Sequence, residues 1–224
     1  MLIIGHRGAA GLAPENTIDA MRAGVAAGAD MLEFDVRLTK DGIPVIIHDA
    51  STRRTHSVSL TVARTDLFDL QVLTSSLPVP TLHDILDEFF GKVRLNIELK
   101  SKGSGIVAAQ AVAEYITEPS DWDSIWFSSF YTAELQAVRT FSEHAKLALL
   151  LRHNPFAFTM LNKRLDLSAV GFYQLAVNPL AVAIAKKRNL TTYAYTVNRV
   201  STARILEREG IDAIVTNRPD IFKQ

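Results

Sequence analysis

Cysteine is missing from this 224-residue sequence, which excludes disulfide bonds, thiol nucleophiles and thiolate metal ligands. Any metal site must therefore use oxygen and imidazole ligands. The sequence also lacks a run of the roughly 20 apolar residues that cross a bilayer. The N-terminal MLIIGHRG has no basic residue before its short apolar run, so no secretory signal is expected. Together these absences predict a cytoplasmic protein without stable membrane insertion.

Net charge is absent as well, because 24 Lys and Arg residues balance 24 Asp and Glu residues. A balanced chain has no basic field that would collect nucleic acid or an anionic membrane surface. We therefore expect a small-molecule partner and no nucleic acid. At this length, one barrel-sized α/β domain spanning residues 1–224 is favoured over two small domains.

Met31 to Asp49 carries acids where a buried strand would carry aliphatic side chains. Glu33 and Asp35 are two residues apart, so on a strand both carboxylates point to one face. Buried carboxylates without a partner cost several kcal/mol or take up protons. The pair therefore indicates either a site for a divalent cation or two acids on a solvated edge strand.

A hairpin is expected directly after this acid pair. Asp41 and Gly42 form a strong turn signal between two apolar runs. Too few residues follow Val36 for the crossover that two parallel strands would need. The chain is therefore expected to run past the sheet, turn, and return as an antiparallel arm that brings His48 roughly opposite Asp35.

Strand and helix patterns alternate along the remaining chain. The expected strands are 2–5, the strand that holds Glu33 and Asp35, 94–100, 124–127, 146–151, 169–173, 191–196 and 212–216. Parallel strands with helices between them predict a closed (β/α)8 TIM barrel, with an open doubly wound sheet as the alternative. A helix is expected from Pro14 to Ala27, capped by Asn16 or an earlier residue. Residues 50–80 are expected to form a small inserted lobe.

Three carboxylates fall on two neighbouring strands near their C-terminal ends, where the active sites of such barrels lie. Glu33, Asp35 and Glu98 form an all-oxygen set that suits Mg²⁺ or Ca²⁺, whereas zinc would prefer more nitrogen or sulfur. The alternative is a buried ion network without a metal, in which the acids pair with Arg7, Arg37 and Lys100.

Histidines and cations are expected at the same end of the barrel. His6 and His48 come from different strands and could flank a reacting group as general acid and base. Arg7 and Lys100, beside a divalent metal, would stabilise the charge of a phosphoryl group. Several aromatic side chains could wall a pocket, although aromatics at strand ends often only pack: Phe130, Tyr131, Phe172, Tyr173 and Tyr195.

Motifs along nearly the whole chain resemble the glycerophosphodiester phosphodiesterase family. In order they are HRG at 6–8, PENT at 14–17, EFDVRLTKDG from Glu33, HD at 48–49, PTL at 80–82, NIELK at 96–100, SSF at 128–130, TVN at 196–198 and GIDAIVTNRPD from Gly210. The resemblance implies a metal-dependent (β/α)8 hydrolase that cuts glycerophosphodiesters to sn-glycerol 3-phosphate and an alcohol.

The resemblance also assigns roles to residues. Glu33, Asp35 and Glu98 would hold one divalent cation, Mg²⁺ or Ca²⁺, His6 and His48 would be the acid and base, and Arg7 and Lys100 would bind the phosphate, with Phe130 and Tyr195 in the substrate pocket. Two positions depart from the family, which often has tryptophan at Tyr195 and aspartate at Asn217. The released alcohol, the attacking oxygen (water, or a glycerol hydroxyl that would give a cyclic phosphate) and the oligomeric state stay open.

Two other functions fit the same barrel. One is a phospholipase D-like or C-like enzyme for lysophospholipids, which predicts an exposed apolar lip made of Leu60, Val62, Leu67, Phe68 and Leu70. The other is a barrel that binds a phosphorylated ligand without catalysis. The presence of every expected catalytic position makes the enzyme the favoured interpretation.

Overall fold

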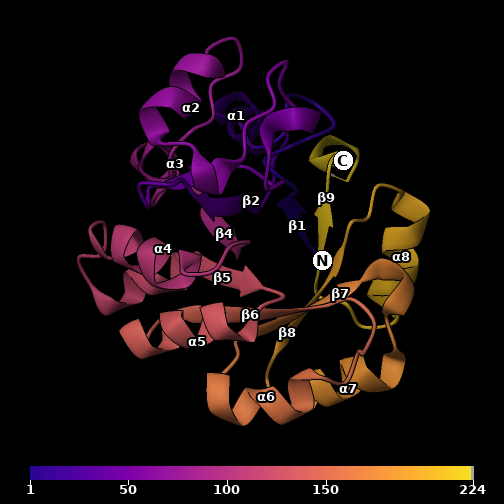
Figure 1. Cartoon of the computed structure of the whole chain (residues 1–224). Coiled ribbons are helices and arrows are strands. Elements are labelled where there is room, and N and C mark those ends of the chain that lie inside the picture. The colour runs from indigo at the N-terminus through magenta and orange to yellow at the C-terminus, as the bar shows by residue number, and fades with distance from the viewer. Residues whose placement is uncertain (223–224) are drawn as a thin grey trace.

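Eight parallel strands close into a barrel in the computed structural model, which describes residues 1–222 (Figure 1). The strands are β1 Leu2–Gly5, β2 Met31–Leu38, β4 Arg94–Leu99, β5 Ile125–Ser129, β6 Lys146–Leu151, β7 Ala169–Tyr173, β8 Thr191–Tyr195 and β9 Ala213–Thr216. They follow one another in this order around the barrel, and β9 pairs with β1 to close it. The predicted (β/α)8 fold is confirmed.

Helices surround the barrel (Figure 1). They are α1 Ile18–Ala26, α3 Leu82–Phe89, α4 Ser104–Ala113, α5 Thr132–Phe141, α6 Phe158–Leu165, α7 Pro179–Lys187 and α8 Val200–Arg208, with short 3₁₀ turns η3 Pro119–Ser124, η4 Gln174–Ala176 and η5 Pro219–Ile221. None of the helices within residues 1–222 is long and apolar enough to cross a bilayer.

Helix α1 begins later than predicted, at Ile18 instead of Pro14. Thr17 is its cap, because the Thr17 side chain accepts a hydrogen bond from the Ala20 amide at 3.1 Å. Asn16 has a left-handed backbone with φ of 58°, so the helix cannot include it. The prediction that Asn16 caps the helix is wrong, because its buried side chain faces the barrel interior instead.

The predicted returning arm is present as β3, Pro44–Ile46, which pairs antiparallel to β2. Val36 lies opposite Ile46, and the Ile47 amide donates to the Asp35 carbonyl oxygen at 2.9 Å. His48 follows Ile47 directly, so its backbone arrives beside the acid pair. The prediction that a hairpin returns this histidine to Asp35 is confirmed.

The segment from residue 50 to 80 packs on the hairpin arm. It contains the 3₁₀ turns η1 Thr52–Arg54 and η2 Val62–Arg64 and helix α2 Leu67–Leu73. A separate apolar cluster joins it to the arm, made of Val45, Ile47, Val62, Leu70 and Val79. The expected apolar lip is wrong, because Val62 and Leu70 are buried, Leu60 and Leu67 are partly buried, and only Phe68 of that set is exposed.

Gly171 in β7 leaves room for a buried tyrosine of the next strand. It lies opposite Tyr193 in the register, and a Cβ at residue 171 would be 2.5 Å from Tyr193 Cζ. Overpacking of a core costs about 1–3 kcal/mol. Gly171→Ala is therefore expected to lower the free energy of unfolding by about 2 kcal/mol in urea titrations. Adding Tyr193→Leu should recover part of this loss, and no recovery would contradict the packing explanation.

Candidate active site

A tight turn after β1 aims Arg7 at the acids of β2. Arg7 and Gly8 both have left-handed backbones, with φ of 50° and 83°. A Cβ at residue 8 would lie 2.4 Å from the Ala20 backbone, so only glycine fits between this turn and α1. The turn directs the Arg7 amide to Glu33 Oε2 at 2.9 Å and the Arg7 Nε to Asp35 Oδ2 at 3.3 Å.

The three predicted acids meet at the mouth of the barrel. Glu33, Asp35 and Glu98 are all buried, and each offers one oxygen within 4.8 Å of the others. Lys100 lies against this cluster, with its Nζ 3.1 Å from Asp35 Oδ1 and 2.5 Å from Glu98 Oε1. Asp35 and Glu98 are paired across β2 and β4, which explains why side chains distant in the sequence converge.

The surroundings shift the pKa values of the three acids in different directions. Burial disfavours ionisation of Asp35, but Lys100 and Arg7 outweigh it and hold the pKa of Asp35 below its ordinary value. Burial raises the pKa of Glu98 to about 7 despite Lys100. Burial, together with Asp35 and Glu98, raises the pKa of Glu33 well above its ordinary value.

An ion network without a metal, the alternative considered from the sequence, is therefore incomplete. Glu33 Oε1 is buried and has no hydrogen-bond partner among residues 1–222. Arg37, expected to neutralise an acid, instead donates to the carbonyl oxygens of His48 at 2.7 Å and Lys100 at 3.4 Å. An uncompensated buried carboxylate beside two others is a donor set that fits a divalent cation.

Asn16 holds Asp35 in place, a role that the sequence reasoning missed. The Asn16 side-chain amide donates to Asp35 Oδ2 at 2.8 Å, and its Oδ1 accepts from the Asp35 amide at 3.2 Å. The PENT motif contains the signal, but an asparagine before a helix is more commonly a cap. Asn16 therefore fixes the orientation of one candidate metal ligand.

His6 extends from the end of β1 and is held by Asn217. Its Nδ1 lies 2.5 Å from Asn217 Oδ1, and its Nε2 lies 4.0 Å from Glu33 Oε2. Burial, with a smaller effect of Arg7, lowers the pKa of His6 to about 4. His6 is thus neutral at pH 7. With Nδ1–H donated to the amide oxygen, Nε2 faces the acids as a proton acceptor.

His48 has a charged partner instead. Its Nδ1 lies 2.6 Å from the Asp49 carboxylate. Burial lowers the pKa of His48, and the nearby Asp35 and Asp49 oppose that shift. A carboxylate stabilises an imidazolium far better than a neutral amide does, so His48 holds a proton more readily than His6. The two histidines differ in their partners and hence in the chemistry they suit.

Arg54 binds carboxylates from two segments of the site, Glu15 of the PENT segment and Asp49 after the hairpin arm. Its guanidinium donates to Glu15 and, through Nε, to Asp49 Oδ2 at 2.7 Å. Glu15 in turn accepts from Arg7 Nη1 at 2.8 Å, and Asp49 contacts His48. A chain of ion pairs thus runs from the phosphate-binding candidate Arg7 to the proton-transfer candidate His48 (the Arg54 network).

We expect Arg54→Ala to lower kcat on a glycerophosphodiester roughly 10–100-fold, the range found when residues that orient active-site groups are removed. Glu15 and Asp49 would lose their shared cation, and Arg7 and His48 would lose their orientation. Arg54→Lys should rescue little, because one ammonium cannot replace the planar fork. Steady-state kinetics provides the measurement. Arg53→Ala, at the exposed neighbouring residue, is the control, and an equal loss in both variants would contradict this role.

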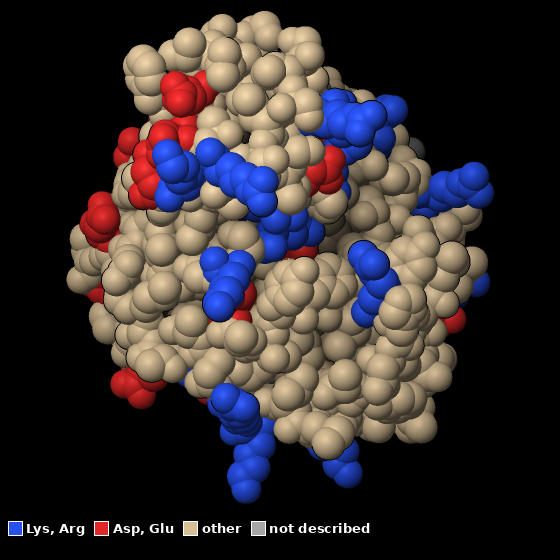
Figure 2. All heavy atoms as spheres, viewed as in Figure 1, with Lys and Arg blue, Asp and Glu red and all other residues tan. Residues whose placement is uncertain are grey.

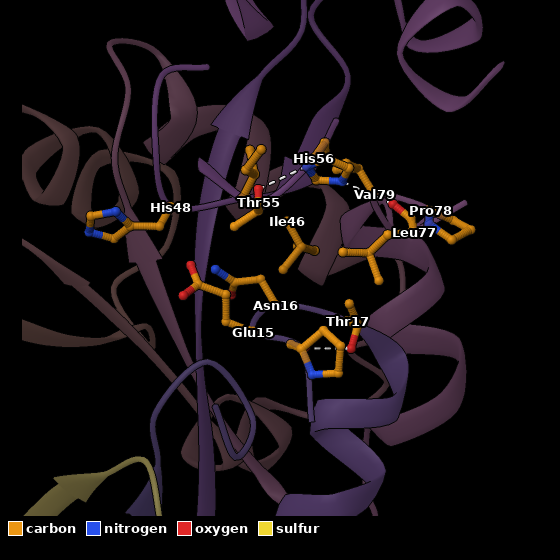
Figure 3. A pocket seen from close by; sticks show the side chains of 12 residues that line it. Glu15, Asn16, Thr17, Ile46, His48, Thr55, His56, Leu77, Pro78 and Val79 are labelled. Atoms are coloured by element: carbon orange, nitrogen blue, oxygen red, sulfur yellow. Dashed lines mark hydrogen bonds between the residues drawn. The ribbon is translucent and has the colours of Figure 1, made fainter. Parts of the chain in front are cut away.

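Figure 3 shows a pocket lined by the PENT segment, the hairpin arm and residues 55–56 and 77–79. Ile46, Leu77 and Val79 give it apolar walls, and the His48 ring points away from Leu77 in this view. His56 closes one side, since its Nε2 contacts the Leu77 carbonyl oxygen at 2.9 Å and its Nδ1 contacts Thr55 Oγ1 at 2.8 Å. None of the three acids lines it. The pocket therefore adjoins the acid cluster without being part of it.

The two predicted pocket aromatics meet edge to face above the acids. The Phe130 and Tyr195 ring centroids are 6.0 Å apart, and Lys100 Nζ lies 5.9 Å from the Phe130 centroid. Tyr195 Oη donates to the Leu151 carbonyl oxygen at 2.8 Å. Both rings thus wall the space beside the acid cluster. Figure 2 shows this face of the molecule hollowed near its centre, with Lys and Arg side chains around the hollow.

Comparison with known proteins gives one consistent family. A sequence model of the glycerophosphoryl diester phosphodiesterase family matches residues 6–221. The chain is 34% identical to YhdW of Bacillus subtilis (strain 168), a candidate glycerophosphodiester phosphodiesterase, over 99% of this chain and 96% of that protein. It is 30% identical to a glycerophosphodiester phosphodiesterase of Caldanaerobacter subterraneus subsp. tengcongensis, over 98% of this chain and 95% of that one.

Solved structures agree with the sequence relatives. A phosphodiesterase of Oleispira antarctica in complex with the product sn-glycerol-3-phosphate superimposes with a TM-score of 0.85 at 25% identity, covering 99% of this chain and 94% of that chain. A glycerophosphodiester phosphodiesterase of Thermotoga maritima gives a TM-score of 0.83 at 26% identity, covering 99% and 96%. Fold and sequence therefore point to the same relatives.

Proposed function

The chain belongs to the glycerophosphoryl diester phosphodiesterase family, and we infer that it hydrolyses glycerophosphodiesters to sn-glycerol 3-phosphate and an alcohol. One observation supports the reaction most strongly. Three buried carboxylates converge beside two histidines and two cations, and Glu33 Oε1 among them has no hydrogen-bond partner within residues 1–222. The test is release of glycerol 3-phosphate from a panel of glycerophosphodiesters, measured with Mg²⁺, with Ca²⁺ and with a chelator.

Glu33, Asp35 and Glu98 are proposed to hold one divalent cation, Mg²⁺ or Ca²⁺. The support is the chemistry of the donors, since three carboxylate oxygens suit hard cations. When bound, such a cation would neutralise charge on the phosphate oxygens. Asn16 keeps the Asp35 carboxylate oriented toward the cluster through its two hydrogen bonds.

Arg7 and Lys100 are proposed to bind the phosphate of the substrate. Both cations already form ion pairs with the acid cluster. The low dielectric of this buried region strengthens charge–charge interactions there. Nearby carboxylates, Asp35 first, outweigh burial and raise the pKa of both side chains, so both stay charged at pH 7. A planar guanidinium and an ammonium can then stabilise the charge that develops on the phosphoryl oxygens.

The histidines are proposed to divide the proton transfers. His6 Nε2 accepts a proton from the attacking oxygen, which belongs to water or a hydroxyl group, as that oxygen bonds to phosphorus. His48 gives a proton to the departing alcohol oxygen as the phosphorus–oxygen bond breaks. The support is their different partners, the neutral Asn217 amide for His6 and the Asp49 carboxylate for His48.

The attacking oxygen belongs to water or to the neighbouring hydroxyl of the glycerol. The second route passes through a cyclic glycerol phosphate, which rapid-quench experiments under single-turnover conditions would detect. Failure to observe it under those conditions would count against the second route. The cytoplasmic location predicted from the sequence is tested by cell fractionation.

A further inference from the structure

Arg152 is a cation at the barrel mouth that the proposed mechanism does not use. It follows β6 and is exposed, and its guanidinium carbon lies 5.5 Å from the centroid of the Phe130 ring. Its guanidinium also interacts electrostatically with Tyr195, but no hydrogen bond or ion pair joins Arg152 to another of the residues 1–222. A guanidinium without a carboxylate partner is available to an anion from solution.

The surroundings of Arg152 form a cleft of about 700 Å³ over the ends of β6, β7 and β8. Its lining includes Arg152, His153, Tyr173, Gln174, Leu175 and Tyr195, and it contains no carboxylate. Tyr195 also holds the backbone just before Arg152, through its hydrogen bond to the Leu151 carbonyl oxygen. The cleft therefore presents a positive charge within a mixed polar and apolar lining, and the Tyr195 hydrogen bond holds one of its walls.

Tyr195 lines both this cleft and the space beside Glu33 and Glu98, and Phe130 packs against Tyr195. Arg152 and Lys100 lie 5.5 and 5.9 Å from the centroid of the same ring. A substrate whose scissile phosphate contacts Lys100 can thus place a second group beside Arg152. The distance from one cation to the other cannot exceed the sum of these two lengths, which is within the reach of a three-carbon alcohol.

A cationic group would be disfavoured at this place. The aromatic rings of Phe130, Tyr173 and Tyr195 would otherwise suit a quaternary ammonium such as choline. The Arg152 guanidinium already interacts with the Phe130 ring, and like charges repel. The same cation attracts a phosphate or carboxylate and can bind it with two parallel hydrogen bonds.

We propose that the cleft at Arg152 binds a second negatively charged group of the substrate, so that the enzyme prefers glycerophosphodiesters with a further phosphate or carboxylate over those of choline or ethanolamine. This inference rests on the proposed function, because it names the substrate class for that reaction. Arg152 supplies the charge, and the cleft supplies the space.

Calorimetry with two product-like probes tests the inference without turnover. Wild-type protein should bind glycerol 1,3-bisphosphate about tenfold more tightly than sn-glycerol 3-phosphate, the order expected for a partly exposed charge-assisted contact. Arg152→Ala should remove that difference, and Arg152→Lys should keep part of it. Arg208→Ala is the control, since it removes the same charge from an exposed residue in the last turn of α8. Equal affinities in the wild type would overturn the inference.

Kinetics then locates the charged group. On glycerophosphoglycerol and its phosphorylated form, Arg152→Ala should lower the ratio of kcat/KM, charged over neutral, about tenfold. Equal losses on both substrates would contradict the inference and leave Arg152 as a packing residue for Phe130. Two glycerol phosphates as products would show that the charged half leaves, whereas glycerol and a bisphosphate would show that it is retained. If neither substrate were hydrolysed, the proposed function would be contradicted, and the calorimetry would still test binding in the cleft.

Discussion

Glu33→Gln is expected to lower kcat/KM for a glycerophosphodiester by about 10³-fold, equivalent to about 4 kcal/mol of transition-state stabilisation. Glutamine is close in size to glutamate, so the packing changes little, but the side chain loses its negative charge. The buried Glu33 carboxylate is the member of the acid cluster that Lys100 and Arg7 side chains leave uncompensated. Release of glycerol 3-phosphate, with calorimetric titration of Mg²⁺ and Ca²⁺, provides the measurement.

The stability of the same variant separates a metal site from an ion network. Without added metal, Glu33→Gln should raise the melting temperature, because it removes an uncompensated buried charge. Added Mg²⁺ or Ca²⁺ should stabilise the wild type and no longer stabilise the variant. If Glu33 belonged to a purely structural ion network, the substitution would instead lower the melting temperature and leave the metal response unchanged. Glu134→Gln, at a buried carboxylate that binds the amides of Gly103 and Gly105, is the matched control.

His6→Ala and His48→Ala are each expected to lower kcat by about 10²–10⁴-fold, the contribution typical of a positioned acid or base. The proposed division of roles predicts different responses to the leaving group. A p-nitrophenyl ester of glycerol 3-phosphate releases a weakly basic anion that needs no proton donor. His48→Ala should therefore recover most of its activity on this ester, whereas His6→Ala should stay impaired on both substrates.

Two results would contradict these roles of His6 and His48. If His48→Ala lost as much activity on the p-nitrophenyl ester as on glycerophosphoglycerol, His48 would not be the acid. Recovery by His6→Ala alone would reverse the two roles. His144→Ala is the control, because this exposed histidine lies between α5 and β6, away from the C-terminal ends of the strands.

The sequence predicted the parts of the molecule that depend on short-range patterns. The period-two spacing of Glu33 and Asp35 put both carboxylates on one face of β2, and the Asp41–Gly42 turn required an antiparallel return. Barrel topology then carried Glu98 to the same end, because the C-terminal ends of parallel strands meet at one mouth. A family resemblance added roles for these residues.

The supporting residues could not be predicted in this way. Asn16 was predicted as a helix cap, yet its left-handed backbone turns the amide toward Asp35. Arg54 stands in a segment of weak pattern, and its role depends on a Glu15 far away in the sequence. Hydrogen-bond partners of this kind follow from how separate segments pack, which no local spacing encodes.

Local patterns were therefore enough to predict the (β/α)8 barrel, the hairpin arm and the acids, histidines and cations at the barrel mouth, because hydrophobic period and turn chemistry depend on residues close together in the sequence. Which charges compensate one another could be seen only in the folded chain. The folded chain leaves Glu33 Oε1 without a hydrogen-bond partner among the described residues, joins Arg7 to His48 through the Arg54 network, and sets Arg152 over Phe130. Charge balance depends on distances and burial in three dimensions, and these exist only once the chain has folded.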